Sequence, residues 1–144
     1  MNRTGLWVGA AAVAAVGGYL ALGPTGSEDA GPAALPAGAA LAEVTVPDDL
    51  PEEARIGQRV FEAKCAECHG ENAAGRNGAG PPLVHRIYEP SHHGDAAFLL
   101  AARNGVRAHH WTFGNMMPVE GITDAEIGYV TRYVRALQEA NGID

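Results

Sequence analysis

Apolar residues recur at helical spacing in three segments of the chain, all of them after residue 50. The first segment runs from about residue 51 to residue 68. One helical face of this segment carries three apolar side chains, Ile56, Val60 and Phe61. Asp49 is the expected N-cap, and Pro51 suits the first turn. This pattern predicts a helix that leads directly into the pair of cysteines near its end.

Two further helices come after the first. The second is expected from about Asp95 to Arg103, because Asn104-Gly105 ends the pattern. The third begins at a capping box, Thr123-Asp124-Ala125-Glu126, and ends at Asn141-Gly142. Its apolar face carries Ile127, Val130, Val134 and Leu137. The stretches 69–90 and 106–121 are long loops rich in Gly, Pro, His and Asn, which is typical of loops that surround a cofactor. With no strand pattern of any length, the predicted fold class is all-α.

The N-terminal segment has a different character. Residues 1–22 contain an uncharged apolar run from Leu6 to Leu22, which as a helix is roughly 25 Å long. The two interpretations are a cleaved signal sequence and a retained N-terminal membrane anchor. Because Pro24 follows closely and no A-x-A site is evident, the pattern favours the anchor. Either interpretation places the rest of the chain outside the cytoplasm.

Composition divides the remaining residues into a linker and a domain. Residues 23–49 are rich in Ala, Gly and Pro and predict a flexible linker. Residues 50–144 form the expected folded domain. The formal net charge of the chain is −7, and the sequence has no basic stretch, so a nucleic-acid partner is not expected. The chain contains two cysteines, too few for a stabilising disulfide framework.

Those two cysteines belong to the motif Cys65-Ala66-Glu67-Cys68-His69, the C-x-x-C-H pattern of haem attachment. Two thiols at this spacing can add to two vinyl groups on one edge of a porphyrin, and the next imidazole can reach the iron. A thioredoxin-like dithiol would need a preceding strand, and a structural zinc site would need four ligands. Neither requirement is met. The motif therefore predicts one covalent haem c held by Cys65, Cys68 and His69.

Over residues 52–143 the chain resembles the class I cytochromes c. The resemblance implies the cytochrome c fold, with three main helices and long loops around the haem. It also implies that the first and last helices cross. In that crossing Gly57 would allow close approach, and Phe61 and Tyr133 would fill the contact.

Two loops extend the resemblance. Gly80-Pro81-Pro82-Leu83 is similar to the family's G-P-x-L loop, which implies that the Pro81 carbonyl accepts a hydrogen bond from the ring N–H of His69. In Asn115-Met116-Met117-Pro118, the methionine directly before the proline has the position of the family's sixth iron ligand. Met117 is the expected ligand, and Met116 is the alternative.

The histidines leave further alternatives open. His109 or His110 could replace a methionine on the iron, although solvated surface histidines are the simpler interpretation. His92 and His93 could bind a transition metal, but again a solvated loop is the simpler interpretation. Trp111 could donate its indole N–H to a haem propionate or could merely pack on the haem edge.

The resemblance implies an electron carrier and not an enzyme. Its expected partners are redox proteins, such as a quinol-oxidising complex and a terminal oxidase or reductase. The expected location is the cell membrane, with a single N-terminal pass and the haem domain in the periplasm, or the soluble periplasm if the leader is cleaved. A small haem peroxidase or reductase, or a haem sensor with a labile distal ligand, is the alternative.

Overall fold

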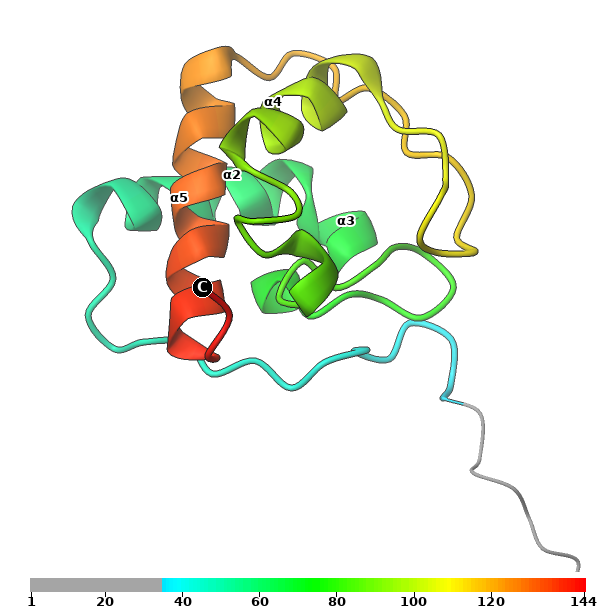
Figure 1. Ribbon diagram of the computed structural model, residues 1–144, viewed down its shortest axis with the longest axis horizontal. Helices are drawn as coiled ribbons and strands as arrows, with labels where there is room; N and C mark the ends of the chain where they lie inside the picture. Colours follow the sequence, from blue (N-terminus) through cyan, green and yellow to red (C-terminus); the bar gives the residue numbers. More distant parts are fainter. Residues whose placement is uncertain (1–34) are drawn as a thin grey trace, which may run out of the picture. The chain divides into compact units, whose positions relative to one another are not determined.

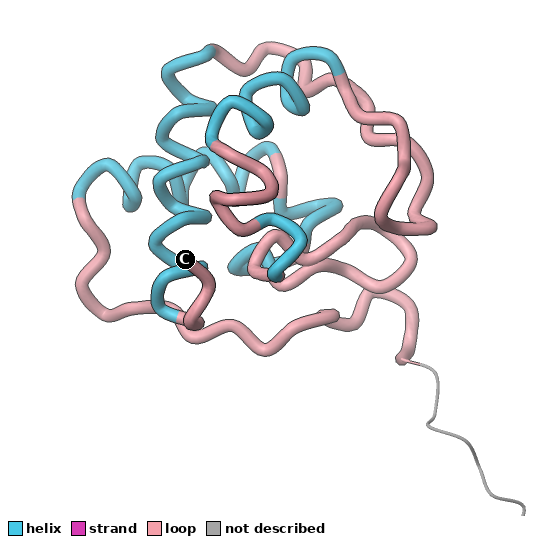
Figure 2. Tube along the Cα trace, in the orientation of Figure 1, coloured by secondary structure: helices cyan, strands magenta, loops and turns pink. Residues whose placement is uncertain are grey.

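Helices and long loops make up residues 35–144, the part of the chain that the computed structural model describes (Figures 1 and 2). The helical elements follow one another as α2 (Glu52–Lys64), α3 (Ala66–His69), the 3-10 turns η1 (Glu71–Ala73) and η2 (Arg86–Tyr88), α4 (Asp95–Asn104) and α5 (Asp124–Ala140). Within residues 35–144 there is no β-strand, and extended pairing is limited to two isolated bridges. The all-α prediction is confirmed for these residues.

The predicted membrane helix, residues 1–22, and residues 23–34 of the predicted linker lie outside the described residues. Among residues 35–144, no helix is both long enough and apolar enough to cross a bilayer. The described unit begins at Leu35, which is earlier than the predicted domain boundary at Leu50.

Residues 35–49 differ from the flexible linker that their composition predicts. The backbone N–H groups of Leu41 and Ala42 donate to the carbonyl of Ala74, at 3.0 and 2.9 Å. Val46 packs against the core. In Figure 1 this cyan segment runs along the base of the domain. The backbone of this segment therefore finds its hydrogen-bond partner in the chain that follows α3. A composition poor in large apolar residues does not reveal this docking.

The first predicted helix needs two corrections. It begins at Glu52 with Pro51 as its N-cap, and the carbonyl of Pro51 accepts from the N–H of Arg55 at 3.0 Å, so Asp49 is not the cap. The helix also does not continue to Cys68. Its regular backbone ends at Cys65, where φ is −123°, and the short α3 begins at the next residue. This break separates α2 from α3, which carries Cys68 and His69.

The two other helices agree with their predicted bounds to within a residue or two. The side chain of Thr123 accepts a hydrogen bond from the N–H of Glu126, and the Glu126 carboxylate accepts one from the N–H of Thr123, so the capping box is present. The predicted apolar face of α5 is buried, namely Ile127, Val130, Val134 and Leu137. Local pattern was sufficient here because a cap and a helical stripe involve only near neighbours.

The core is centred on the crossing of α2 with α5, which lie against each other in Figure 1. A Cβ atom on Gly57 would lie 1.9 Å from the backbone oxygen of Tyr129, so only glycine permits this approach. Phe61 and Tyr133 are fully buried, with ring centroids 5.7 Å apart. The predicted roles of Gly57, Phe61 and Tyr133 at the crossing are confirmed.

We expect Gly57→Ala to lower the free energy of unfolding of the haem-loaded protein by at least about 2 kcal/mol, because the added methyl group forces the helices apart. Gly128→Ala is the matched control, since a Cβ there meets nothing within 4 Å. It should be neutral or raise stability by up to about 1 kcal/mol through helix propensity. Denaturant titration measures both, and equal effects would contradict the steric account.

Candidate functional site

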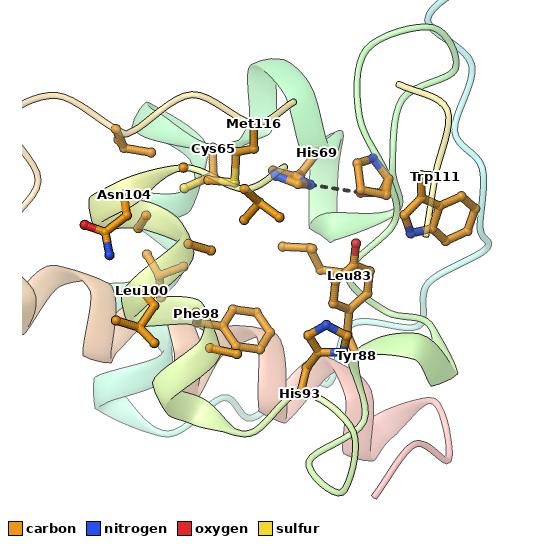
Figure 3. Close-up of a pocket in the computed structure, with 18 of the residues that line it drawn as sticks. Cys65, His69, Leu83, Tyr88, His93, Phe98, Leu100, Asn104, Trp111 and Met116 are labelled. Atoms are coloured by element: carbon orange, nitrogen blue, oxygen red, sulfur yellow. Dashed lines mark hydrogen bonds between the residues drawn. The ribbon is translucent and has the colours of Figure 1, made fainter. Parts of the chain in front are cut away.

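An apolar cavity of about 440 Å³ lies beside the haem motif. This volume is within the range of cofactor pockets, roughly 300–1,000 Å³. Its wall comes from the end of α2, from α3, α4 and α5, and from both long loops (Figure 3). The sequence-predicted residues that line it are Cys65, His69, Pro81, His109, His110, Trp111 and Met116. Cys68 and Met117 are the predicted site residues that do not line it.

His69 is held in one orientation by the Gly80-Pro81 loop. Its Nδ1 lies 2.9 Å from the carbonyl oxygen of Pro81 (Figure 3). Since a carbonyl only accepts, Nδ1 carries the proton and Nε2 keeps a free lone pair. A Cβ on Gly80 would lie 2.7 Å from the carbonyl oxygen of Cys68, which is too close for any side chain. The loop can therefore approach the motif this closely because residue 80 is a glycine. The hydrogen bond implied by the resemblance is therefore present in the structure.

Burial sets the protonation state of the motif. It lowers the pKa of His69, an effect that the Pro81 carbonyl partly offsets, so the imidazole is neutral at physiological pH. Burial also raises the pKa of the Cys65 thiol to about 11, with Cys68 contributing in the same direction. Cys68 itself is exposed. Cys65 and His69 line the cavity, and Cys68 does not.

A β-bridge decides which methionine faces the cavity. Val106 and Met116 exchange two backbone hydrogen bonds, each of 2.9 Å, and both residues line the cavity. Successive side chains of extended backbone point to opposite sides, so Met117 points away, and it is 74% exposed. Of the two candidate methionines, Met116 therefore lines the cavity and Met117 does not. Because two consecutive methionines precede Pro118, the position before the proline does not by itself show which of them faces the cavity.

Trp111 presents a buried donor to the cavity. Its indole Nε1 is buried and has no hydrogen-bond partner within residues 35–144. Burial raises the pKa of Tyr88, and the indole N–H partly offsets this rise. A buried N–H without a partner is costly, which indicates that it serves a ligand acceptor.

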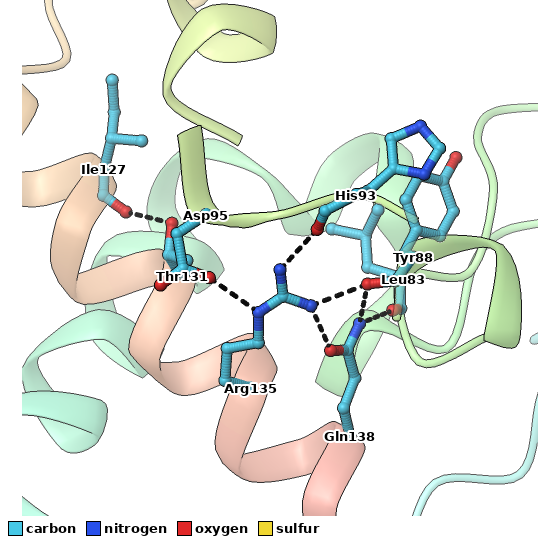
Figure 4. A network of polar contacts seen from close by, with 8 residues as sticks. All are labelled: Leu83, Tyr88, His93, Asp95, Ile127, Thr131, Arg135 and Gln138. Carbon is cyan, nitrogen blue, oxygen red and sulfur yellow. Dashed lines mark hydrogen bonds and ion pairs between the residues drawn. The ribbon is translucent and has the colours of Figure 1, made fainter. Parts of the chain in front are cut away.

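Several lining residues have no signature in the sequence, among them Tyr88 and His93. Tyr88 ends η2 and His93 lies between η2 and α4, and the backbone of this segment is held by α5 (Figure 4). Arg135 donates to the carbonyl oxygens of Tyr88 and His93, at 2.7 and 2.5 Å. Gln138, which is fully buried, donates to the carbonyl oxygens of Tyr88 and Leu83, at 3.0 and 2.8 Å. These bonds fix the cavity wall on that side.

Arg135 is itself well anchored. Its side chain is 17% exposed, and its Nε donates to Asp95 at 2.9 Å. Its guanidinium carbon lies 4.9 Å from the centre of the Phe98 ring, which also lines the cavity. A sequence signal for this wall is the helical spacing of Phe98, Ala101 and Ala102, which lie on α4 and line the cavity. No periodicity identifies the hydrogen bonds of Arg135.

Comparison with known proteins agrees with this site. A family model described as Cytochrome c matches residues 54–138, which include the haem motif, the cavity and nearly all of α5. The chain belongs to the cytochrome c family. It is therefore a class I c-type cytochrome, and members of this family bind haem c covalently and function in haem-based electron transfer. No significant match was found among curated proteins or among solved structures.

The cavity of this cytochrome suits a haem. Its wall is almost entirely apolar, as the porphyrin faces require, and His69 presents a neutral imidazole with a free Nε2. Cys65 and Cys68 are the two cysteines of the whole chain, so covalent attachment has no other thiols to use. The donor set and the lining are thus consistent with the cofactor that the family implies.

Arg135→Ala should lower the free energy of unfolding of the cytochrome by about 1–3 kcal/mol, because the partly buried carbonyl oxygen of His93 loses its donor and that of Tyr88 keeps only Gln138. Arg132→Ala is the matched control on the same helix. Arg132 pairs with Glu53 at 2.6 Å, but the two side chains are 60% and 53% exposed. This change should cost less than about 1 kcal/mol. Denaturant melts of both variants provide the comparison, and similar losses would mean that Arg135 is an ordinary surface residue.

Proposed function

We propose that this cytochrome is a single-haem electron carrier in which His69 and Met116 are the axial ligands of the iron. Cys65 and Cys68 would hold the haem through thioether bonds. The chain has one C-x-x-C-H motif, so one haem is expected. The observation that carries this assignment is that His69 and Met116 both line one apolar cavity, while Met117 is exposed.

The environment of His69 supports its role as the proximal ligand. An iron-bound histidine uses the lone pair of one ring nitrogen, and its other ring nitrogen usually donates to a carbonyl or a carboxylate. His69 has this arrangement, with Nδ1–H directed to Pro81. Its lowered pKa keeps the imidazole neutral, so no proton competes for Nε2.

Met116 is supported by its backbone pairing. The two hydrogen bonds with Val106 hold the loop after α4 against the loop before α5, so the thioether is presented by a braced segment. A thioether favours ferrous iron and raises the reduction potential, which suits a carrier. When bound, the haem supplies a reversible one-electron iron couple. The protein's part is to hold two axial ligands and to keep the centre dry.

Trp111 would donate its indole N–H to a haem propionate. Its buried donor has no protein partner in the part of the chain that the structure describes. A propionate oxygen would satisfy it with a charge-assisted hydrogen bond. Packing alone would leave this buried N–H without an acceptor.

We also propose an extracytoplasmic location. The uncharged run from Leu6 to Leu22 would anchor the chain in the cell membrane, with the haem domain in the periplasm. In the periplasm the partners of the haem domain would be redox proteins, such as a quinol-oxidising complex and a terminal oxidase or reductase. An anchored domain meets such partners at high local concentration.

We expect Met116→Ala to abolish the sulfur-to-ferric-iron absorption band at the red end of the visible spectrum and to lower the reduction potential markedly. Met117→Ala, the neighbouring control, should leave both properties nearly unchanged. Optical spectroscopy and a redox titration of the haem-loaded variants measure the two effects.

The reverse pattern would return the ligand to Met117. Insensitivity to both substitutions would exclude a methionine ligand and point to His109 or His110, which also line the cavity.

Cell fractionation combined with intact-mass measurement tests the anchor. We expect the cytochrome in the membrane fraction with residues 1–22 present in the mass. Soluble periplasmic protein whose mass lacks the N-terminal segment would show that it is a cleaved signal sequence, without affecting the haem assignment.

A further inference from the structure

Four histidines gather at the rim of the haem cavity. His92 and His93 precede α4, and His109 and His110 follow it. The ring centroids of His92 and His93 are 4.6 Å apart, and each of these rings is 5.3 Å from that of His110. Residues 92 and 110 are 18 positions apart, so tertiary structure brings these two loops together.

Three of the four present their nitrogens to a common point. The ligand atoms of His92, His93 and His110 all lie within 4.8 Å of one another. The Nε2 atoms of His92 and His110 are 3.4 Å apart. In a tetrahedral zinc site with Zn–N bonds of about 2.0–2.1 Å, two ligand nitrogens are separated by about 3.4 Å. The separation of this pair therefore matches one edge of such a site.

The backbone prepares His93 for this role. Its Nδ1–H donates to the carbonyl oxygen of Ile87 at 2.6 Å, which leaves the lone pair on Nε2. A backbone carbonyl on the far ring nitrogen is the usual support of a metal-bound histidine. Arg135 holds the carbonyl of His93, and the carbonyl of Glu89 accepts from the N–H groups of both His92 and His93. The turn is thus fixed before any ion binds.

We propose that His92, His93 and His110 form a binding site for a divalent transition-metal ion at the rim of the haem cavity. Three imidazoles without a carboxylate among them suit Zn²⁺, Cu²⁺ or Ni²⁺ and not Ca²⁺ or Mg²⁺, which require oxygen ligands. A water molecule would complete a four-coordinate site. Bringing the three nitrogens into full coordination requires small rotations of exposed side chains. This site is separate from the haem iron as long as a methionine is the sixth ligand, whether Met116 or Met117, because His110 is then free to bind a second ion.

His92 and His109 provide the sharpest comparison. His92 belongs to the cluster and does not line the haem cavity, so its substitution leaves the haem wall intact. His109 packs on His110, with ring centroids 4.2 Å apart, yet is outside the set of three. Its Nδ1 instead donates to the carbonyl of Arg107 at 2.8 Å.

The experiment is calorimetric titration of Zn²⁺ into haem-loaded cytochrome that has been treated with chelator and then freed of it. We expect one Zn²⁺ per chain, with affinity at least tenfold weaker in His92→Gln and in His110→Gln. In His109→Gln the affinity should change by less than about threefold. Cu²⁺ should give an electron paramagnetic resonance spectrum with nitrogen hyperfine splitting, which His92→Gln reduces.

Three outcomes would overturn the proposal. These are no saturable Zn²⁺ binding, equal losses in His92→Gln and His109→Gln, and several weak Zn²⁺ ions per chain. An absence of saturable Zn²⁺ binding would mean that His92 and His110 share only a hydrogen bond. The visible haem spectrum of each variant checks that the domain is intact. If His110→Gln disturbs that spectrum, His92→Gln decides the test.

Discussion

The close approach of α2 and α5 at Gly57 is the contact on which the rest of the domain depends. A single Cβ atom at this position would fall 1.9 Å from a backbone oxygen of α5. With the helices this close, Phe61 and Tyr133 bury each other, and the end of α2 delivers Cys65 to the cavity. Ile127 and Val130 of α5 also line the cavity, so one crossing positions both the motif and part of the cavity wall.

The cavity explains why so small a domain needs its cofactor. A chain of this size buries a limited fraction of its apolar surface, and here the space between the helices and loops is itself apolar. A haem in that space is both the redox centre and the missing part of the core. The cofactor also explains why the two loops are long, because they have to cover a group much larger than a protein side chain.

Long loops carry functional residues well only when something fixes their backbone. In this cytochrome, Arg135 and Gln138 satisfy the carbonyl oxygens of the segment that carries Tyr88 and His93. The paired backbone of Val106 and Met116 has the same effect on the other loop. The histidines at the rim of the cavity lie where these two segments meet. The fixed backbone on both sides explains how their ring nitrogens are held close to one another.

The features that could be predicted from the amino-acid order are local ones: the C-x-x-C-H motif, the capping box at Thr123 and the apolar face of α5. Each depends on spacing within a few residues, which helical periodicity and covalent chemistry set directly. The tertiary structure alone decided four features: the docking of residues 35–49, the exposure of Met117 beside a cavity-lining Met116, the histidine cluster and the network of Arg135. Those depend on which backbone groups find distant partners. A shift of one position in such pairing reverses the side that a residue faces, as the two adjacent methionines demonstrate.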